Sequence, residues 1–257
     1  MLIGILQAGH APEGLGEKHG SYPEMFERLI KGAEPSFRFK TYVAVEGEVP
    51  GDPRACDAWL ITGSRHGVYD RLAWMAPLGE LIRAAMETSV PVVGICFGHQ
   101  IVADALGGTV EKSAKGWGVG IHSYLVSDRP DWLKPDADTF AINAVHQDQV
   151  VVLPEGARVL AHSDFCPNAM IAYGDRAFTI QGHPEFENAF ARDLIDTRLS
   201  QVAPEDVLNR ARKTLTREPD SALVARWIAG FLKHAIAARA GLPSAVECGA
   251  RPQPAGL

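Results

Sequence analysis

The stretch Pro91-Val92-Val93-Gly94-Ile95-Cys96-Phe97-Gly98 decides how this chain is expected to fold. An apolar run over residues 90–95 ends at Cys96, and apolar residues at helical spacing follow over residues 99–106. The pattern predicts a strand, a tight turn and a helix. Glycines two residues before and after Cys96 suit this turn because its backbone is pinched. The turn would place the Cys96 sulfur at a helix N-terminus, whose positive dipole end favours the reactive thiolate.

A lone cysteine that ends a strand is more often a buried core residue than a nucleophile. The glycines around Cys96 favour the nucleophile, and so does a second stretch, Gly182-His183-Pro184-Glu185-Phe186. This stretch follows a strand-like run, residues 177–180, and supplies a histidine and a carboxylate on one loop. Cysteine, histidine and glutamate are the residue types of a nucleophile, a general base and the acid that orients the base.

The composition is that of an ordinary globular protein, with 46% hydrophobic and 22% charged residues among 257. A net charge of −6 and the absence of a basic run predict that the chain does not bind nucleic acid. We find no apolar stretch long enough to span a bilayer, so no membrane association is expected. The chain opens on an apolar, strand-like run without the features of a signal peptide.

The cysteines point to a reducing, cytoplasmic compartment. Four of them are scattered without paired spacing: Cys56, Cys96, Cys166 and Cys248. This distribution argues against a disulfide framework and against a zinc site. Cys166 lacks the glycines and the helix start that surround Cys96, and we interpret it as a structural thiol.

The two motifs together resemble those of the class I (triad) glutamine amidotransferases, over about residues 1–195. Residues 94–100 read Gly-Ile-Cys-Phe-Gly-His-Gln and residues 182–185 read Gly-His-Pro-Glu. Either motif alone would be a weak signal, but the pair in this order is specific. The resemblance implies an α/β fold, a flavodoxin-like three-layer sandwich with a mostly parallel sheet. It also implies catalytic roles for Cys96 as nucleophile, His183 as base and Glu185 as the residue that orients the base.

The same resemblance extends to an oxyanion hole. The family's loop Gly-Gly-Pro-x-Ser-Val-Tyr-Asp is matched at Gly63 and at residues 68–70, while Ser64 and Arg65 depart from it. One backbone amide is expected from Gly63 or Ser64 and the other from Phe97, next to the nucleophile. Because the donors are backbone groups, a serine in place of glycine need not abolish the function.

Further residues are expected to bind the substrate. Gln100, one turn into the helix after Cys96, matches a family glutamine that contacts the substrate. His146, Gln147 and Asp148 match a His-x-Asp-x-Val pattern whose backbone meets the α-amino and α-carboxylate groups of a glutamyl substrate. We interpret His146 as pocket architecture, since only His183 has a Pro-Glu partner beside it.

The pattern after Phe186 is helical. We predict a class I amidotransferase-like domain over residues 1–199, a C-terminal helical extension over 200–240 and a flexible tail over 241–257. A helix over 222–238 is apolar on one side, around Trp227 and Phe231. This side is expected to pack on the main domain; the alternative is a second copy of the chain in a homodimer.

The resemblance implies cleavage of a γ-glutamyl amide through a cysteine thioester, the glutaminase half-reaction, with no metal or organic cofactor. The chain is similar to the amidotransferase half of GMP synthetase but lacks the ATP-pyrophosphatase loop Ser-Gly-Gly-x-Asp-Ser of the other half. Two hydrolytic alternatives stay open: ammonia supply to a separate synthetase, and γ-glutamyl peptidase action on glutathione-like conjugates. A third is a non-catalytic binding or regulatory protein on the same fold, against which the intact Cys-His-Glu set speaks.

Overall fold

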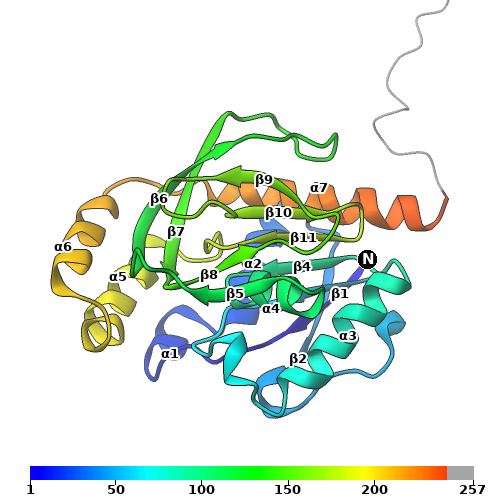
Figure 1. Ribbon diagram of the computed structural model, residues 1–257, viewed down its shortest axis with the longest axis horizontal. Helices are drawn as coiled ribbons and strands as arrows, with labels where there is room; N and C mark the ends of the chain where they lie inside the picture. Colours follow the sequence, from blue (N-terminus) through cyan, green and yellow to red (C-terminus); the bar gives the residue numbers. More distant parts are fainter. Residues whose placement is uncertain (242–257) are drawn as a thin grey trace, which may run out of the picture.

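The computed structural model describes residues 1–241 and centres on a nine-stranded sheet (Figure 1). The strand order is β2-β1-β3-β4-β11-β10-β9-β6-β7. The first half of this order is parallel and comprises β2 (Arg38–Tyr42), β1 (Leu2–Leu6), β3 (Ala58–Ile61), β4 (Val92–Ile95) and β11 (Ala177–Ile180). Since strand β4 ends at Cys96 and β11 runs beside it in parallel, the loops after both strands emerge at the same edge of the sheet.

The second half of the sheet is antiparallel. It is built from β10 (Met170–Tyr173), β9 (Arg158–His162), β6 (Gly118–Val126) and β7 (Thr139–His146). A separate two-stranded sheet pairs β5 (Thr109–Lys112) with β8 (Asp148–Val152). The backbone bridge between Asn143 and His183 joins β7 to the loop after β11. This bridge brings the antiparallel half to the edge where Cys96 lies.

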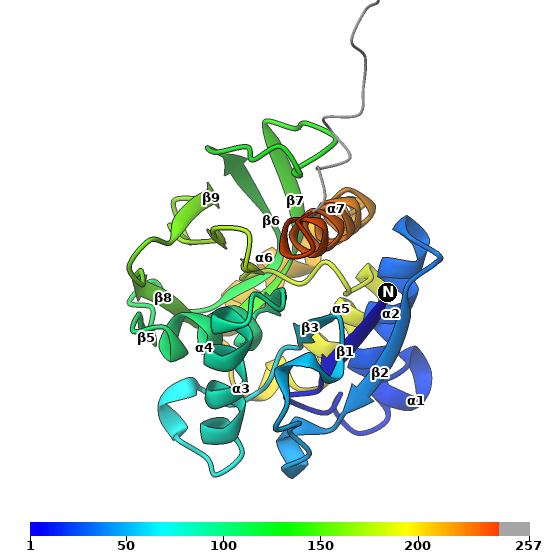
Figure 2. The same ribbon diagram turned by 90° about the vertical axis from the view of Figure 1, so that its right-hand side faces the viewer.

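Helices cover both faces of the parallel strands, which gives the expected three layers. The helices are α1 (Leu15–His19), α2 (Tyr22–Ala33), α3 (Met75–Glu87), α4 (Phe97–Ala105), α5 (Asn188–Thr197), α6 (Glu205–Thr214) and α7 (Ser221–Arg239). Figure 2 shows α2 and α7 on one side of these strands and α3 and α4 on the other. The fold class predicted from the sequence is therefore confirmed.

Helix α2 begins at a capping box. The Ser21 hydroxyl accepts a hydrogen bond from the amide of Glu24, and the Glu24 carboxylate accepts one from the amide of Ser21 at 2.7 Å. Each bond satisfies an amide that the helix start would otherwise leave unpaired. The box fixes Tyr22 as the first helical residue, and this tyrosine lies at the edge of the sheet that carries Cys96.

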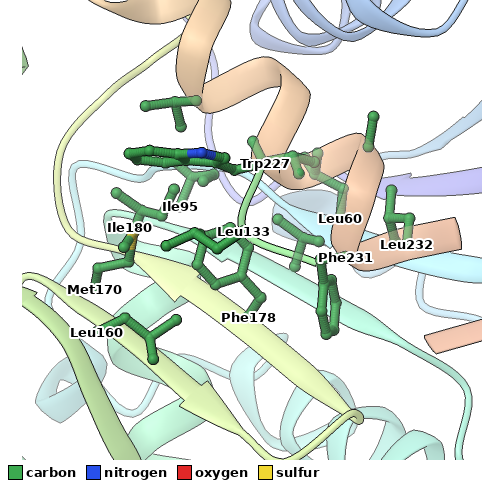
Figure 3. Close-up of a cluster of buried hydrophobic side chains, with 14 of the residues drawn as sticks. Leu60, Ile95, Leu133, Leu160, Met170, Phe178, Ile180, Trp227, Phe231 and Leu232 are labelled. Carbon is green, nitrogen blue, oxygen red and sulfur yellow. The ribbon is translucent and has the colours of Figure 1, made fainter. Parts of the chain in front are cut away.

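Helix α7 completes the core with the apolar face that the sequence predicted. Trp227, Phe231 and Leu232 are fully buried and pack among side chains of β4, β10 and β11, as Figure 3 shows. The Trp227 indole also donates a hydrogen bond to the carbonyl of Pro135 at 3.0 Å. This face is thus covered by the chain itself and is not left for a second copy. The predicted tail, from residue 242 on, lies outside the described residues.

Candidate active site

The turn between β4 and α4 holds Cys96 in a rare backbone conformation. Its φ of 53° and ψ of −103° lie where only a few per cent of residues other than glycine are found. The two glycines allow the chain to pass through this turn. A Cβ at Gly94 would collide with the carbonyl of Gly98, and a Cβ at Gly98 would collide with the carbonyl of Ile61. The strand-turn-helix predicted from residues 91–98 is present, with Cys96 at the N-terminus of α4.

The loop after β11 holds His183 and Glu185 as a buried pair. The Nδ1 atom of His183 lies 2.7 Å from Oε1 of Glu185, and their side chains are 5% and 1% exposed. The His183 amide donates to the carbonyl of Asn143 at 2.7 Å, and the ring stacks on Phe186 with centroids 4.0 Å apart. With Nδ1 engaged, the imidazole has Nε2 free for proton transfer.

Electrostatics favour the imidazolium form of His183. Burial alone would lower its pKa, but the negative charge of Glu185 and then that of the Cys96 thiolate raise the pKa to about 10. Hydrogen bonds with Cys96 and Glu185 act in the same direction. The ring can therefore hold a proton at neutral pH and deliver it to a nearby atom.

The loop expected to supply an oxyanion donor lies against these side chains. A Cβ at Gly63 would stand 2.9 Å from Cε1 of His183 and 3.7 Å from Cβ of Cys96, so only a glycine fits without displacing a neighbour. Ser64 is half-buried, and its hydroxyl accepts a hydrogen bond from the amide of His66 at 3.2 Å. Phe97 is the first residue of α4, where backbone amides have no intrahelical acceptor.

The remaining predicted residues lie together next to Cys96. The Gln100 amide donates to the carbonyl of Asp148 at 3.0 Å, and the His146 ring lies 3.2 Å from the same carbonyl. Gln147 lines a cavity that also reaches Cys96. Burial and the neighbouring His122 lower the pKa of His146 to about 3, which keeps this ring neutral. Its neutrality is consistent with a role in pocket architecture.

All the predicted site residues except Phe97 and Glu185 line one cavity of about 610 Å³. Part of its wall was not expected from the sequence: Tyr22, Leu194, Arg198, Leu199 and Val202. Tyr22 comes from α2, Leu194 from α5, and Leu199 and Val202 from the short helix η4 (Leu199–Gln201) and the residue after it, while Arg198 joins α5 to η4. Amphipathic spacing predicts that such helices have an apolar side, but it does not reveal that part of this side faces a cavity.

Two further side chains, Cys166 and His10, are of the same residue types as Cys96 and His183 but have other surroundings. Cys166 is 1% exposed, and burial raises its thiol pKa to about 12, as befits a structural thiol. His10 lies at the cavity wall, where its ring is 3.0 Å from Glu46 and 3.1 Å from the side chain of Gln7.

Among residues 1–241 we find no cluster of side chains that could hold a metal ion. In the same part of the chain, no helix has the length and apolarity needed to cross a membrane.

Comparisons with known proteins identify the family of this chain. Residues 55–195 match the family model described as glutamine amidotransferase class-I. The γ-glutamyl peptidase 3 of Arabidopsis thaliana is 29% identical over 231 residues, which are 86% of this chain and 92% of that protein. The GMP synthase (glutamine-hydrolyzing) of Azoarcus sp. strain BH72 is 35% identical over 136 residues, but these are 49% of this chain and only 25% of that enzyme.

Among solved structures, a glutamine amidotransferase from Thermotoga maritima superposes with a TM-score of 0.69 at 19% identity. The match covers 90% of this chain and 98% of that one, so the two share a fold over nearly their whole lengths. The family model spans more than half of the 257 residues and includes both the cysteine turn and the His-Pro-Glu loop. The chain belongs to the class-I glutamine amidotransferase family.

Proposed function

We propose that this protein hydrolyses γ-glutamyl amide bonds through a thioester on Cys96, with His183 as general acid and base and Glu185 as the residue that orients it. One observation carries the proposal: Cys96 at a helix N-terminus and His183, which is paired with the buried Glu185, line the same cavity. Nucleophile, base and orienting acid within reach of one another are the signature of covalent catalysis.

The first half of the reaction forms the thioester. The Cys96 thiolate attacks the γ-carbonyl carbon, and the amides of Phe97 and of Gly63 or Ser64 stabilise the oxyanion. His183 then gives its Nε2 proton to the departing nitrogen as the carbon–nitrogen bond breaks. A raised pKa suits His183 to this step because the ring begins it protonated.

The second half releases glutamate. Neutral His183 takes a proton from water, and the resulting hydroxide attacks the thioester carbon. The carbon–sulfur bond breaks, which leaves a γ-carboxylic acid on the product and a thiolate on Cys96, and the acid then loses its proton to solvent. Glu185 stabilises the imidazolium in both halves through the 2.7 Å contact with Nδ1. Every group that moves a proton in this scheme is a side chain of the protein or the water that reacts.

Relatives favour an independent hydrolase over the ammonia supplier of a synthetase. The similarity to γ-glutamyl peptidase 3 covers 86% of this chain and 92% of that protein, whereas the similarity to GMP synthase covers 49% of this chain and 25% of that enzyme. Ammonia supply to a separate synthetase remains the second candidate, because the GMP synthase relative is 35% identical over the 136 residues that it matches.

The test is an assay of purified protein on glutamine, γ-glutamyl dipeptides and glutathione, with and without ATP. We expect hydrolysis without ATP by the wild type and by Cys166→Ser, and none by Cys96→Ser. Activity retained in Cys96→Ser would contradict the proposal. Hydrolysis only in the presence of ATP and an ammonia acceptor would favour the second candidate.

A further inference from the structure

The cavity extends well beyond what a glutamine side chain needs. At roughly 30 Å³ for each water molecule, 610 Å³ corresponds to about twenty waters, while glutamine has about half as many non-hydrogen atoms. Cavities of this size typically enclose much larger ligands. The additional space must therefore be assigned to a part of the substrate other than the γ-glutamyl group.

The proposed chemistry fixes which side of the cavity holds the leaving group. His183 protonates the departing nitrogen, so the leaving amine lies on the His183 side of Cys96. Phe186 stacks on His183, and beyond it come Tyr22 at 5.8 Å and Phe190 at 4.5 Å between ring centroids. The γ-glutamyl group is left with the part of the cavity lined by Gln100, which donates a hydrogen bond to the carbonyl of Asp148.

Leu194 and Leu199 belong to the same apolar cluster as Phe186, and Tyr22 packs against it. Together with Val202 these three side chains line the cavity as an apolar shelf. Val202 is 44% exposed, an unusual exposure for a large apolar side chain that faces a cavity. Leu194 and Leu199 are buried at the base of the shelf, so Val202 is its solvent-exposed rim, and an apolar cavity wall of this kind is typical of ligand contact. Leu199 and Val202 also lie beyond the region that matches the family model, residues 55–195.

Arg198 stands beside the shelf as an uncommitted cation. It lines the cavity and is half-buried, and within residues 1–241 its guanidinium has no hydrogen-bond or ion-pair partner. Both acids of α5 are engaged elsewhere. Asp193 pairs with Lys18 and His19 at 2.6 Å, and Asp196 pairs with Arg212 at 2.9 Å. A half-buried guanidinium with no acid beside it is available for a carboxylate, which it can bind with two hydrogen bonds.

We propose that this side of the cavity is a subsite for the amine product, in which Arg198 binds a carboxylate and the shelf receives an apolar side chain. The inference rests on the proposed function and narrows it. The preferred substrates are γ-glutamyl amino acids or peptides with a free carboxylate on the leaving amine, and free glutamine is a poor one. Arg198 is a specificity residue, since it contacts the part of the substrate that does not react.

The experiment compares γ-glutamylphenylalanine, its carboxamide and glutamine as substrates of the wild type, Arg198→Gln and a control, Arg192→Gln. Arg192 is an exposed arginine of the same helix that does not line the cavity. A charged hydrogen bond contributes about 1.5–3 kcal/mol, so Arg198→Gln should lower the ratio of kcat/KM for the dipeptide over that for glutamine about 10- to 100-fold. The control should leave this ratio unchanged, and the carboxamide should be insensitive to Arg198→Gln.

A second pair of variants tests the shelf. Val202→Ser should lower the preference for γ-glutamylphenylalanine over γ-glutamylglycine by about fivefold, because it removes buried apolar contact. Val151→Ser, at a residue 46% exposed and outside the cavity, should not. If Arg198→Gln leaves the ratio of kcat/KM for γ-glutamylphenylalanine over that for glutamine unchanged, or if Arg192→Gln changes this ratio equally, the subsite is overturned.

Binding separates a failure of the subsite from a failure of the proposed function. Titration of γ-glutamylphenylalanine into Cys96→Ser, and into Cys96→Ser combined with Arg198→Gln, requires no turnover. If the wild type hydrolyses none of the substrates but Arg198→Gln weakens binding tenfold or more, the proposed function fails and the subsite stands. If hydrolysis occurs, and Arg198→Gln changes neither the binding of γ-glutamylphenylalanine nor the ratio of kcat/KM for this dipeptide over that for glutamine, the subsite fails and the function stands.

Discussion

The change of Glu185 to Gln probes the electrostatics that keep His183 protonated. The substitution keeps the shape of the side chain and the contact with Nδ1, 2.7 Å long in the native chain, but removes the negative charge. Two unit charges about 4 Å apart interact by about 4 kcal/mol at an effective dielectric of about 20. Because 1.36 kcal/mol corresponds to one pKa unit, this loss should bring the pKa of His183 from about 10 to about 7.

The consequence for catalysis depends on pH in a definite direction. His183 must be protonated to release the amine, so activity should be lost as pH rises through its pKa. At pH 8 the wild-type ring is almost fully protonated, whereas a ring with a pKa near 7 is only about one-tenth protonated. Glu185→Gln should therefore lose about tenfold in kcat/KM at pH 8 from this cause and much less at pH 6.

The assay is a pH profile of kcat/KM from pH 5 to 10.5 for a γ-glutamyl dipeptide. The control is Glu187→Gln, which removes an exposed carboxylate two residues further on, with no side-chain partner among residues 1–241. We expect the alkaline limb to move down by about three pH units in Glu185→Gln and to stay in place in Glu187→Gln. An alkaline limb that does not move in Glu185→Gln would refute the assigned role of this carboxylate.

Three further predictions follow from contacts in the structure. Gly63→Ala should lower kcat at least tenfold with little change in Tm, because its methyl group would stand 2.9 Å from His183 Cε1. The control is Gly32→Ala, whose methyl group would have nothing within 4 Å, and equal kinetics of the two variants would count against the close approach. His146→Asn should raise KM while kcat is largely kept, and steady-state kinetics that instead show a collapse of kcat would make His146 part of the chemistry. Trp227→Ala should lower the free energy of unfolding, measured in urea, by about 3–5 kcal/mol, whereas Arg226→Ala, at an exposed neighbour, should change it by less than about 0.5 kcal/mol. Similar values for the two variants would mean that α7 adds little to the core.

Local signals in the sequence were sufficient for the central features of the fold. Gly94 and Gly98 around Cys96 predicted the strand-turn-helix because backbone packed this closely leaves no room for a Cβ. Ser21 and Glu24 mark the start of α2 because the capping box is completed within four residues. The apolar spacing around Trp227 predicted both α7 and its buried face. Each of these features depends on contacts between residues close in sequence or on the period of one helix.

Features that depend on distant pairings could not be predicted in the same way. Strand β11 lies beside β4 although about eighty residues separate them, and the antiparallel half of the sheet depends on similar long-range choices. The cavity wall at Arg198 and Val202 depends on how α5 and η4 pack near Tyr22, which neither amphipathic spacing nor charge reveals. The roles of the individual site residues, and the predicted boundary at residues 199 and 200, stay predictions.

The central claim is that Cys96 carries a γ-glutamyl group as a thioester during turnover, and mass spectrometry of the acid-quenched enzyme tests it most directly. Protein mixed with γ-glutamylphenylalanine for milliseconds should show a mass increase of one γ-glutamyl group, located on the peptide that contains Cys96. The adduct should disappear on treatment with hydroxylamine and be absent from Cys96→Ser, while Cys166→Ser should form it as the wild type does. Hydrolysis that proceeds in the wild type without any adduct on Cys96, and that persists in Cys96→Ser, would contradict the account.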